Sequence, residues 1–161
     1  MKTLVLGLGN SILTDDAAGL RVVDELKNLP LNPDITIERT EAGGINLLEY
    51  LEGYDRTIIV DSVQLPKGKP GQIYRLQPED LPATRYTGLT HGIDFPTILE
   101  LGKMFGMKMP AEIWIFAIQA QDVLTIGEKC TPAVAEAIML CTREIVCLLN
   151  AGSGLESCKS G

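Results

Sequence analysis

The sequence predicts an α/β protein, specifically a three-layer α/β/α sandwich with a mostly parallel, about five-stranded mixed sheet. Short apolar runs alternate along the chain with stretches whose apolar residues recur at helical spacing. The 161 residues are 45% hydrophobic, which is ample for a buried core. We find no internal repeat and no linker. Residues 1–150 are therefore expected to form a single domain, followed by a flexible polar tail at 151–161.

The first half of the chain alternates predicted strands with predicted helices. Residues 3–7 (TLVLG) form a short apolar run bounded by glycine, which is typical of a buried strand. Thr14 can cap a helix that runs from about residue 15 to residue 28. The next elements are a half-buried strand at 34–39, a short helix at 44–52 and a buried strand at 56–61 that ends at an acidic residue.

The second half continues the same alternation. Residues 71–76 (GQIYRL) follow a Pro/Gly turn and indicate an edge or antiparallel strand. Residues 77–92 lack periodicity and are expected to form a loop. A helix at about 94–106 and a buried strand at 112–118 come next. Thr131 and Pro132 open the last helix, whose apolar stripe is Val134, Ile138, Cys141, Ile145 and Leu148.

Charge and composition exclude several kinds of partner. The formal net charge is −7, and no dense block of Lys and Arg occurs. An acidic surface argues against nucleic acid and anionic membranes as partners, and it leaves room for cations or a basic peptide. The most apolar run, residues 113–118, is far too short to span a bilayer. The start of the chain lacks an Ala-x-Ala-type cleavage site, so we expect a cytoplasmic protein without membrane insertion.

The four cysteines, at positions 130, 141, 147 and 158, show no CxxC spacing. In the cytoplasm we expect them to be reduced. Cys141 and Cys147 fit small core residues of the last helix better than redox or metal-binding residues.

Acidic residues and the one histidine follow strands or precede helices at places that can meet in space. In open α/β sheets, sites form outside the carboxyl ends of the strands. Asp15 and Asp16 follow the first strand, Asp61 ends the strand at 56–61, and His91 precedes the helix near residue 94. All of these side chains can therefore lie along one edge of the sheet.

The glycine-rich turn GLGNSILTDDAAG (7–19) does not fit a nucleotide site. Gly7 and Gly9 match the first two glycines of G-x-G-x-x-G, but Ile12 occupies the third position. The carboxylates of Asp15 and Asp16 at the helix start would repel the phosphate that such a turn binds. A Rossmann-like oxidoreductase is therefore a disfavoured alternative. We expect Gly7 and Gly9 to serve backbone geometry and Asn10 to brace the turn.

Each acidic or basic residue also has an ordinary structural interpretation. Acids are common in a first helical turn because the helix dipole stabilises them, an Asp after a strand often caps a loop, and His91 can belong to a simple loop. Together, however, carboxylates and an imidazole are ligands for first-row metals. Three protein ligands would leave an open coordination position, as in catalytic or sensing sites.

The same residues carry a resemblance to a known family. GLGNSILTDDAAG, the helix after it, the strand IIVDSV (58–63) and the His91-Gly92 loop resemble the nickel–iron hydrogenase maturation endopeptidases, over about residues 3–148. The resemblance implies a peptide hydrolase of the aspartate/histidine metal-site type. Its expected action is to remove a C-terminal extension from the precursor of the [NiFe] hydrogenase large subunit after nickel insertion.

The resemblance also implies the site residues and the metal. The family's metal-binding positions match Asp16, Asp61 and His91, which are the expected catalytic and nickel-binding residues. Nickel is expected to arrive with the substrate, and in a crystal another divalent ion can take its place. Asp15 is a candidate general base, and segment 84–93 is a candidate substrate-facing loop. We expect a monomer.

Two loops depart from the family pattern and leave the particular substrate open. Residues 39–42 read Arg-Thr-Glu-Ala where many members carry Asp-Gly-Gly-Thr, and residues 119–121 read Gln-Ala-Gln where a proline often follows the Gln or Glu. The alternative function is a nickel-binding checkpoint or chaperone for hydrogenase assembly that does not cleave.

Overall fold

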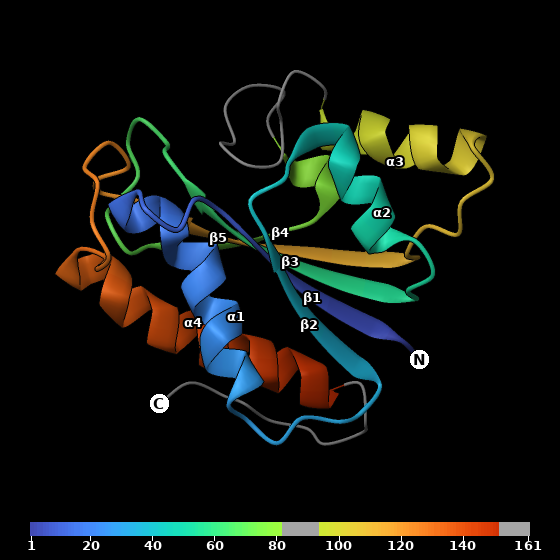
Figure 1. Ribbon diagram of the computed structural model, residues 1–161, viewed down its shortest axis with the longest axis horizontal. Coiled ribbons are helices and arrows are strands. Elements are labelled where there is room, and N and C mark those ends of the chain that lie inside the picture. The colour runs from blue at the N-terminus through green and yellow to red at the C-terminus, as the bar shows by residue number, and fades with distance from the viewer. Residues whose placement is uncertain (82–93, 152–161) are drawn as a thin grey trace.

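A computed structural model describes residues 1–81 and 94–151. They form one five-stranded sheet with the strand order β2-β1-β3-β5-β4 (Figure 1). The strands β1, β2, β3 and β5 run parallel to their neighbours, and β4 pairs antiparallel with β5. The predicted fold class is confirmed, and so is the antiparallel edge strand. The strands are β1 (Thr3–Leu8), β2 (Ile35–Thr40), β3 (Arg56–Val63), β4 (Ile73–Leu76) and β5 (Glu112–Gln119).

Helices cover both faces of the sheet (Figure 1). One face carries α1 (Ala18–Lys27) and α4 (Pro132–Ala151), and the other carries α2 (Leu48–Leu51) and α3 (Phe95–Met104). Short 3-10 helices precede or connect these elements: η1 (Thr14–Ala17), η2 (Gly44–Leu47) and η3 (Pro78–Asp80). The alternation of apolar strands with amphipathic helices thus produces the three layers that the sequence predicts.

Each face of the sheet has its own hydrophobic core. Side chains alternate between the faces of a strand, so Ile58 and Val60 of β3 pack beneath α1 and α4, whereas Ile59 and Val63 pack beneath α2 and α3. The predicted stripe of α4 is confirmed from Val134 to Ile145, all buried, while Leu148 is only half-buried.

Two glycines allow α1 to lie directly on the sheet. A Cβ at Gly19 would overlap the carbonyl oxygens of Leu8 and Val60, and a Cβ at Gly7 would overlap the Gly19 carbonyl oxygen. The start of α1 is therefore held against the carboxyl ends of β1 and β3, where the acidic residues lie. The expectation that Gly7 serves backbone geometry is confirmed.

Several boundaries differ from the prediction. The helix predicted from residue 15 begins as η1 and becomes α-helical only at Ala18, and Thr14 does not cap it. Thr14 has a φ of 27°, and its hydroxyl donates to the Thr125 carbonyl instead. β3 continues two residues beyond Asp61, to Val63. Burial in β2 does not alternate strictly, because its first three residues are all half-buried.

Cys130 and Cys141 are free thiols, and Cys141 is buried in the core as expected. Cys147 is only half-buried and is disulfide-bonded, so the expectation of a reduced thiol is wrong at this position.

Within residues 1–81 and 94–151, no helix has both the length and the apolar character of a transmembrane span. The tail from residue 152 lies outside the described residues, so the division into a domain and a tail stays a prediction.

Candidate functional site

The turn after β1 brings Asp16 back over the end of the strand. Gly9 has a φ of 151°, and a Cβ there would overlap the Asp16 carbonyl oxygen. The backbone nitrogen of Asn10 donates to that same oxygen at 3.2 Å. The side-chain oxygen of Asn10 accepts a hydrogen bond from Ile12 N at 3.2 Å. The predicted roles of Gly9 and Asn10 are confirmed, and both residues set the position of Asp16.

Asp15 is enclosed by the loop between β5 and α4. Its side chain is fully buried, with an exposed fraction of 0%. Oδ2 accepts hydrogen bonds from the backbone nitrogens of Gln121 and Asp122, both at 2.9 Å, and from the Thr131 hydroxyl at 2.8 Å. Oδ1 accepts from Thr131 N at 2.7 Å. Because four donors occupy this carboxylate, its surroundings do not support a role as general base.

Ser62 connects the other two carboxylates. Its hydroxyl donates to Asp16 Oδ1 at 2.8 Å, and its backbone nitrogen donates to Asp61 Oδ1 at 2.8 Å. Asp61 and Ser62 are adjacent on β3 and are both buried, whereas Asp16 is partly exposed. The structure thus brings Asp16 and Asp61 to one place at the carboxyl end of the sheet, as predicted.

The pKa of Asp61 is raised to about 8, chiefly by burial and also by the nearby charge of Asp16, while the hydrogen bond from Ser62 N opposes both effects. A carboxyl group that is costly to ionise here would ionise more readily beside a cation. Asp16 and Asp61, which we call the acidic pair, are therefore chemically suitable partners for a divalent metal ion.

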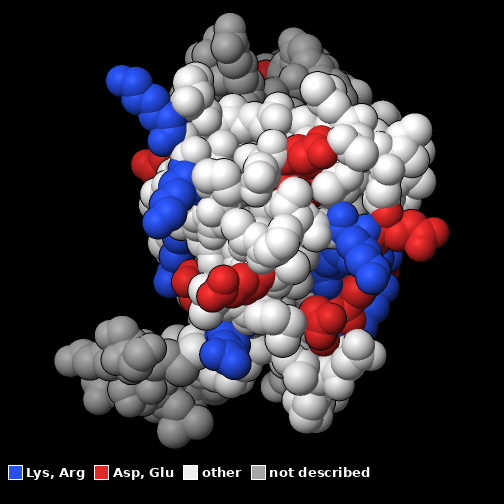
Figure 2. All heavy atoms as spheres, turned by 90° about the vertical axis from the view of Figure 1, so that its left-hand side faces the viewer, with Lys and Arg blue, Asp and Glu red and all other residues white. Residues whose placement is uncertain are grey.

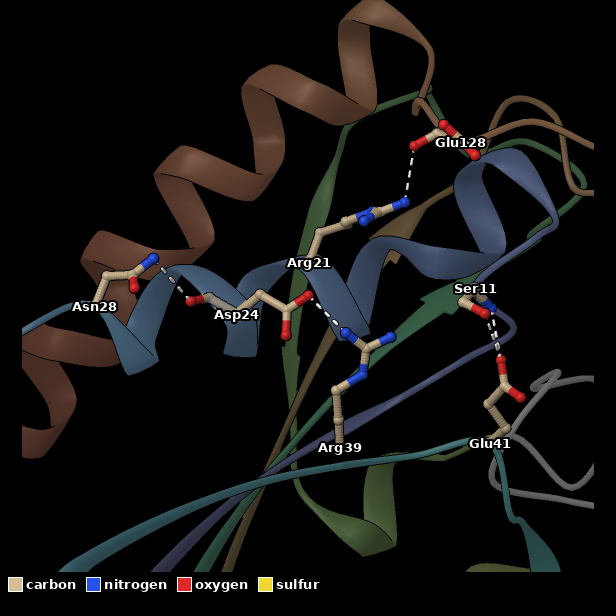
Figure 3. A network of polar contacts seen from close by, with 7 residues as sticks. All are labelled: Ser11, Arg21, Asp24, Asn28, Arg39, Glu41 and Glu128. Carbon is tan, nitrogen blue, oxygen red and sulfur yellow. Dashed lines mark hydrogen bonds and ion pairs between the residues drawn. The ribbon is translucent and has the colours of Figure 1, made fainter.

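Polar side chains join α1 and the turn before it to neighbouring loops and to β2 (Figure 3). Glu41 Oε1 accepts hydrogen bonds from Ser11 N at 2.8 Å and from the Ser11 hydroxyl at 2.9 Å, which joins the loops after β1 and β2. Arg21 of α1 donates to the Glu128 carbonyl at 2.7 Å. Arg39 forms an ion pair with Asp24 at 2.7 Å. Arg39, near the end of β2, and Glu41, in the loop after it, belong to the segment that departs from the family pattern, and both have structural partners.

His91 lies outside the described residues, as does the whole of segment 84–93, so the structure places two of the three predicted site residues. Within the described part of the chain, no group of three or more His, Cys, Asp and Glu residues could hold a metal ion. The structure brings Asp16 and Asp61 together, and the assignment of these two residues and His91 as metal ligands stays a prediction.

Sequence reasoning missed Ser62 and the true partners of Asp15. The available signal for Ser62 was a hydroxyl directly after Asp61. Side chains alternate between the two faces of a strand, so the Ser62 side chain points to the face opposite Asp61. For Asp15 no local signal existed, because its partners lie 106 to 116 residues further along the chain.

The fold and the acidic pair define a class: a three-layer α/β/α protein with its candidate site at the carboxyl ends of parallel strands. Comparison with known proteins narrows this class. The model of the hydrogenase maturation protease family (HycI) matches residues 20–152. The chain therefore belongs to the hydrogenase maturation protease family, and it is an endopeptidase of that family. The predicted resemblance is confirmed.

Individual relatives agree with the family model. The hydrogenase expression/formation protein HupD of Bradyrhizobium diazoefficiens is 29% identical over 142 residues, covering 85% of this chain and 72% of that protein. The hydrogenase 2 maturation protease of Escherichia coli is 39% identical over 85 residues, covering 52% of this chain and 51% of that protein. The structure of the E. coli hydrogenase maturating endopeptidase HybD superposes with a TM-score of 0.75 at 26% identity, covering 97% of this chain and 96% of that one.

Proposed function

We propose that this protein removes the C-terminal extension of a nickel-loaded [NiFe] hydrogenase large-subunit precursor. The observation that carries the proposal is the acidic pair of Asp16 and Asp61, joined through Ser62 at the carboxyl end of a parallel sheet. Membership of the hydrogenase maturation protease family supports the reaction class. The metal dependence and the site residues are the parts that require testing.

In this proposal, Asp16, Asp61 and His91 bind nickel that the precursor brings with it. Carboxylate and imidazole donors suit a divalent first-row metal. The buried, partly charge-coupled Asp61 supports this assignment, because a cation would relieve the cost of ionising it. His91 must be neutral and both acids ionised in order to bind. Ligation would position the scissile bond beside the acidic pair only when nickel is present.

The protein's own residues would supply the geometry of this site. Ser62 orients Asp16 by its hydroxyl hydrogen bond, and the Gly9 turn fixes the backbone of Asp16. Asp15 holds the loop of residues 121–131 against η1. The reaction needs a water and a base, and among the described residues the buried Asp15 is unsuitable for that purpose.

The direct test is cleavage of purified precursor, with and without nickel, followed by mass spectrometry. Wild-type protein should release the C-terminal peptide only from nickel-loaded precursor. Asp16→Asn and His91→Ala should abolish release, while Asp24→Asn, a partly exposed acid of α1, should leave it unchanged. Full processing by the first two variants would refute the assignment of these residues. Binding of nickel-loaded precursor without peptide release would instead indicate a non-cleaving checkpoint.

We also propose that the protein acts as a monomer in the cytoplasm. The net charge of −7 disfavours close approach of two copies, and the free thiols of Cys130 and Cys141 are consistent with a reducing compartment. The disulfide at Cys147 is the observation against that compartment. Sedimentation velocity and cell fractionation test the two statements separately.

A further inference from the structure

Three large apolar side chains project into solvent from the turn that carries Asp16 and from the loop between β5 and α4. They are Ile12, with an exposed fraction of 57%, Leu124 with 87% and Ile126 with 77%, and we call them the apolar rim. A folded protein gains nothing from exposing such side chains, and neighbouring apolar groups on a surface often mark an interaction site.

The rim is held in a defined conformation by backbone hydrogen bonds. Leu13 and Ile126 form an antiparallel bridge, and Gly127 N donates to the Ile12 carbonyl at 2.9 Å. The Asp122 carboxylate accepts hydrogen bonds from Leu124 N and Thr125 N, both at 2.9 Å. Because these loops are already ordered, a partner that binds them would pay little additional conformational entropy.

The rim is continuous with the candidate site. Ile12 belongs to the same turn as Asp16, and Asp15 ties the loop that carries Leu124 and Ile126 to that turn. Figure 2 faces the side of the molecule on which this loop lies, and it shows uncharged surface interrupted by patches of Asp and Glu, with Lys and Arg mostly toward its edges. Because Ile12 and Asp16 share one short turn, a protein substrate bound at Asp16 would lie close to the rim.

We propose that the apolar rim is the docking surface for an apolar segment of the hydrogenase precursor. The inference rests on the proposed function and adds the surface that would bind the folded substrate while its C-terminal extension is presented to Asp16. Apolar contact at the rim would be made equally before and during the reaction. It should therefore contribute to substrate affinity and not to the rate of the chemical step.

A second copy of this chain is a less suitable occupant. A two-fold dimer brings the same patch of both copies together. Glu41 lies beside Ser11, next to Ile12, and hydrogen bonds from Ser11 hold the pKa of this carboxyl below its usual value, so it is charged. Two copies joined at the rim would bring these like charges close, on proteins that each carry −7.

The test replaces the rim and a matched surface. The rim variant is Ile12→Gln, Leu124→Gln and Ile126→Gln. The control variant is Met104→Gln and Phe105→Gln, at the C-terminal end of α3, where the exposed fractions are 79% and 65%. Both variants keep the net charge and alter only exposed side chains, and thermal unfolding by circular dichroism verifies the fold.

Binding and cleavage are measured separately on nickel-loaded precursor. For the rim variant we expect the Kd, measured by biosensor, and the KM for cleavage to rise about tenfold or more, with kcat unchanged within about twofold. The control variant should match the wild type. Unchanged affinity of the rim variant, or equal loss in both variants, would overturn the proposal.

Two further outcomes separate this inference from the proposed function. If wild-type protein binds the precursor without cleaving it, the proposed cleavage fails, and the docking surface is judged by the Kd values alone. If wild-type protein does not bind the precursor, the docking proposal fails as well. A wild-type dimer that the rim substitutions convert to a monomer in sedimentation velocity would show a self-interface and would overturn the proposal.

Discussion

The carboxylates of Asp15 and Asp16 belong to consecutive residues but bind different parts of the fold. Asp15 accepts hydrogen bonds from Gln121, Asp122 and Thr131, and Asp16 accepts one from Ser62 of β3. Asp15 therefore joins two loops, and Asp16 remains partly exposed at the candidate site. This division of roles leads to separate predictions for the two residues.

Asp15→Asn should destabilise the protein. An amide carries one acceptor oxygen and presents an NH2 group to backbone donors, so several of the four hydrogen bonds would be lost at a fully buried position. We expect a loss of about 3 kcal/mol in the free energy of unfolding, measured by urea denaturation. The control Asp24→Asn breaks a partly exposed ion pair with Arg39 and should cost less than about 1 kcal/mol. Equal effects would contradict the role of Asp15.

Ser62→Ala should impair the reaction more than the fold. The Ser62 hydroxyl orients Asp16, and loss of such an orienting partner typically reduces metal affinity or activity by about 10–100-fold. Initial rates of precursor cleavage provide the measurement. Thr57→Val, on the same strand, is the control and should leave cleavage unchanged. A Ser62 variant with wild-type kcat/KM would show that Asp16 needs no such orientation.

Thr57→Val should also stabilise the protein. Within the described part of the chain, Thr57 Oγ1 is the buried side-chain oxygen or nitrogen that lacks a hydrogen-bond partner. Replacing its hydroxyl with a methyl group removes the cost of burying an unpaired polar atom, so we expect a gain of about 1 kcal/mol in thermal or urea unfolding. Thr142→Val is the comparison, since the Thr142 hydroxyl donates to the Ile138 carbonyl at 2.8 Å. That variant should gain nothing.

The raised pKa of Asp61 predicts how the free energy of unfolding depends on pH in the metal-free protein. The pKa of Asp61 is about 8 in the folded state, and an Asp in an unfolded chain has a pKa of about 3.9. Between these values the folded state binds more protons than the unfolded state. The contribution of Asp61 to the free energy of unfolding should therefore fall as the pH rises from about 4 to about 8.

Asp61→Asn should remove this contribution, so that the variant gains stability relative to wild type as the pH rises through this window. Urea denaturation at about pH 5, 6.5 and 8 measures the effect. The first two values lie within the window and the third lies at its upper limit. Glu25→Gln, at an exposed acid of α1, is the control and should follow the wild-type profile. A wild-type profile for Asp61→Asn would mean that Asp61 ionises normally in the folded protein.

The periodicity of the sequence was sufficient for most of the fold. Apolar runs such as those of β3 and β5 are buried on both faces, and that burial makes a strand visible without knowledge of its neighbours. The Pro/Gly turn before β4 correctly indicated an edge strand. The start of α1 was predicted less well. Thr14 has the composition of a helix cap, but its hydroxyl binds Thr125, which lies 111 residues away in sequence.

The candidate site was predictable only in part for the same reason. The rule that sites form at the carboxyl ends of parallel strands correctly placed Asp16 and Asp61 together. The helix-start interpretation of Asp15 considered only its local neighbours, whereas its donors come from residues 121, 122 and 131. Tertiary hydrogen bonds of this kind leave no periodic trace in a sequence.

We expect the hydrogen bonds between Asp15 and Thr131 also to set when the molecule can become active. These two residues are 116 positions apart, so the contact forms only after most of the chain has left the ribosome. Contacts between distant residues form late because the long intervening loop must first be closed. A nascent chain that lacks α4 would hold the Asp16 turn without the loop that supports it. Acquisition of peptidase activity should therefore report on one of the last steps of folding.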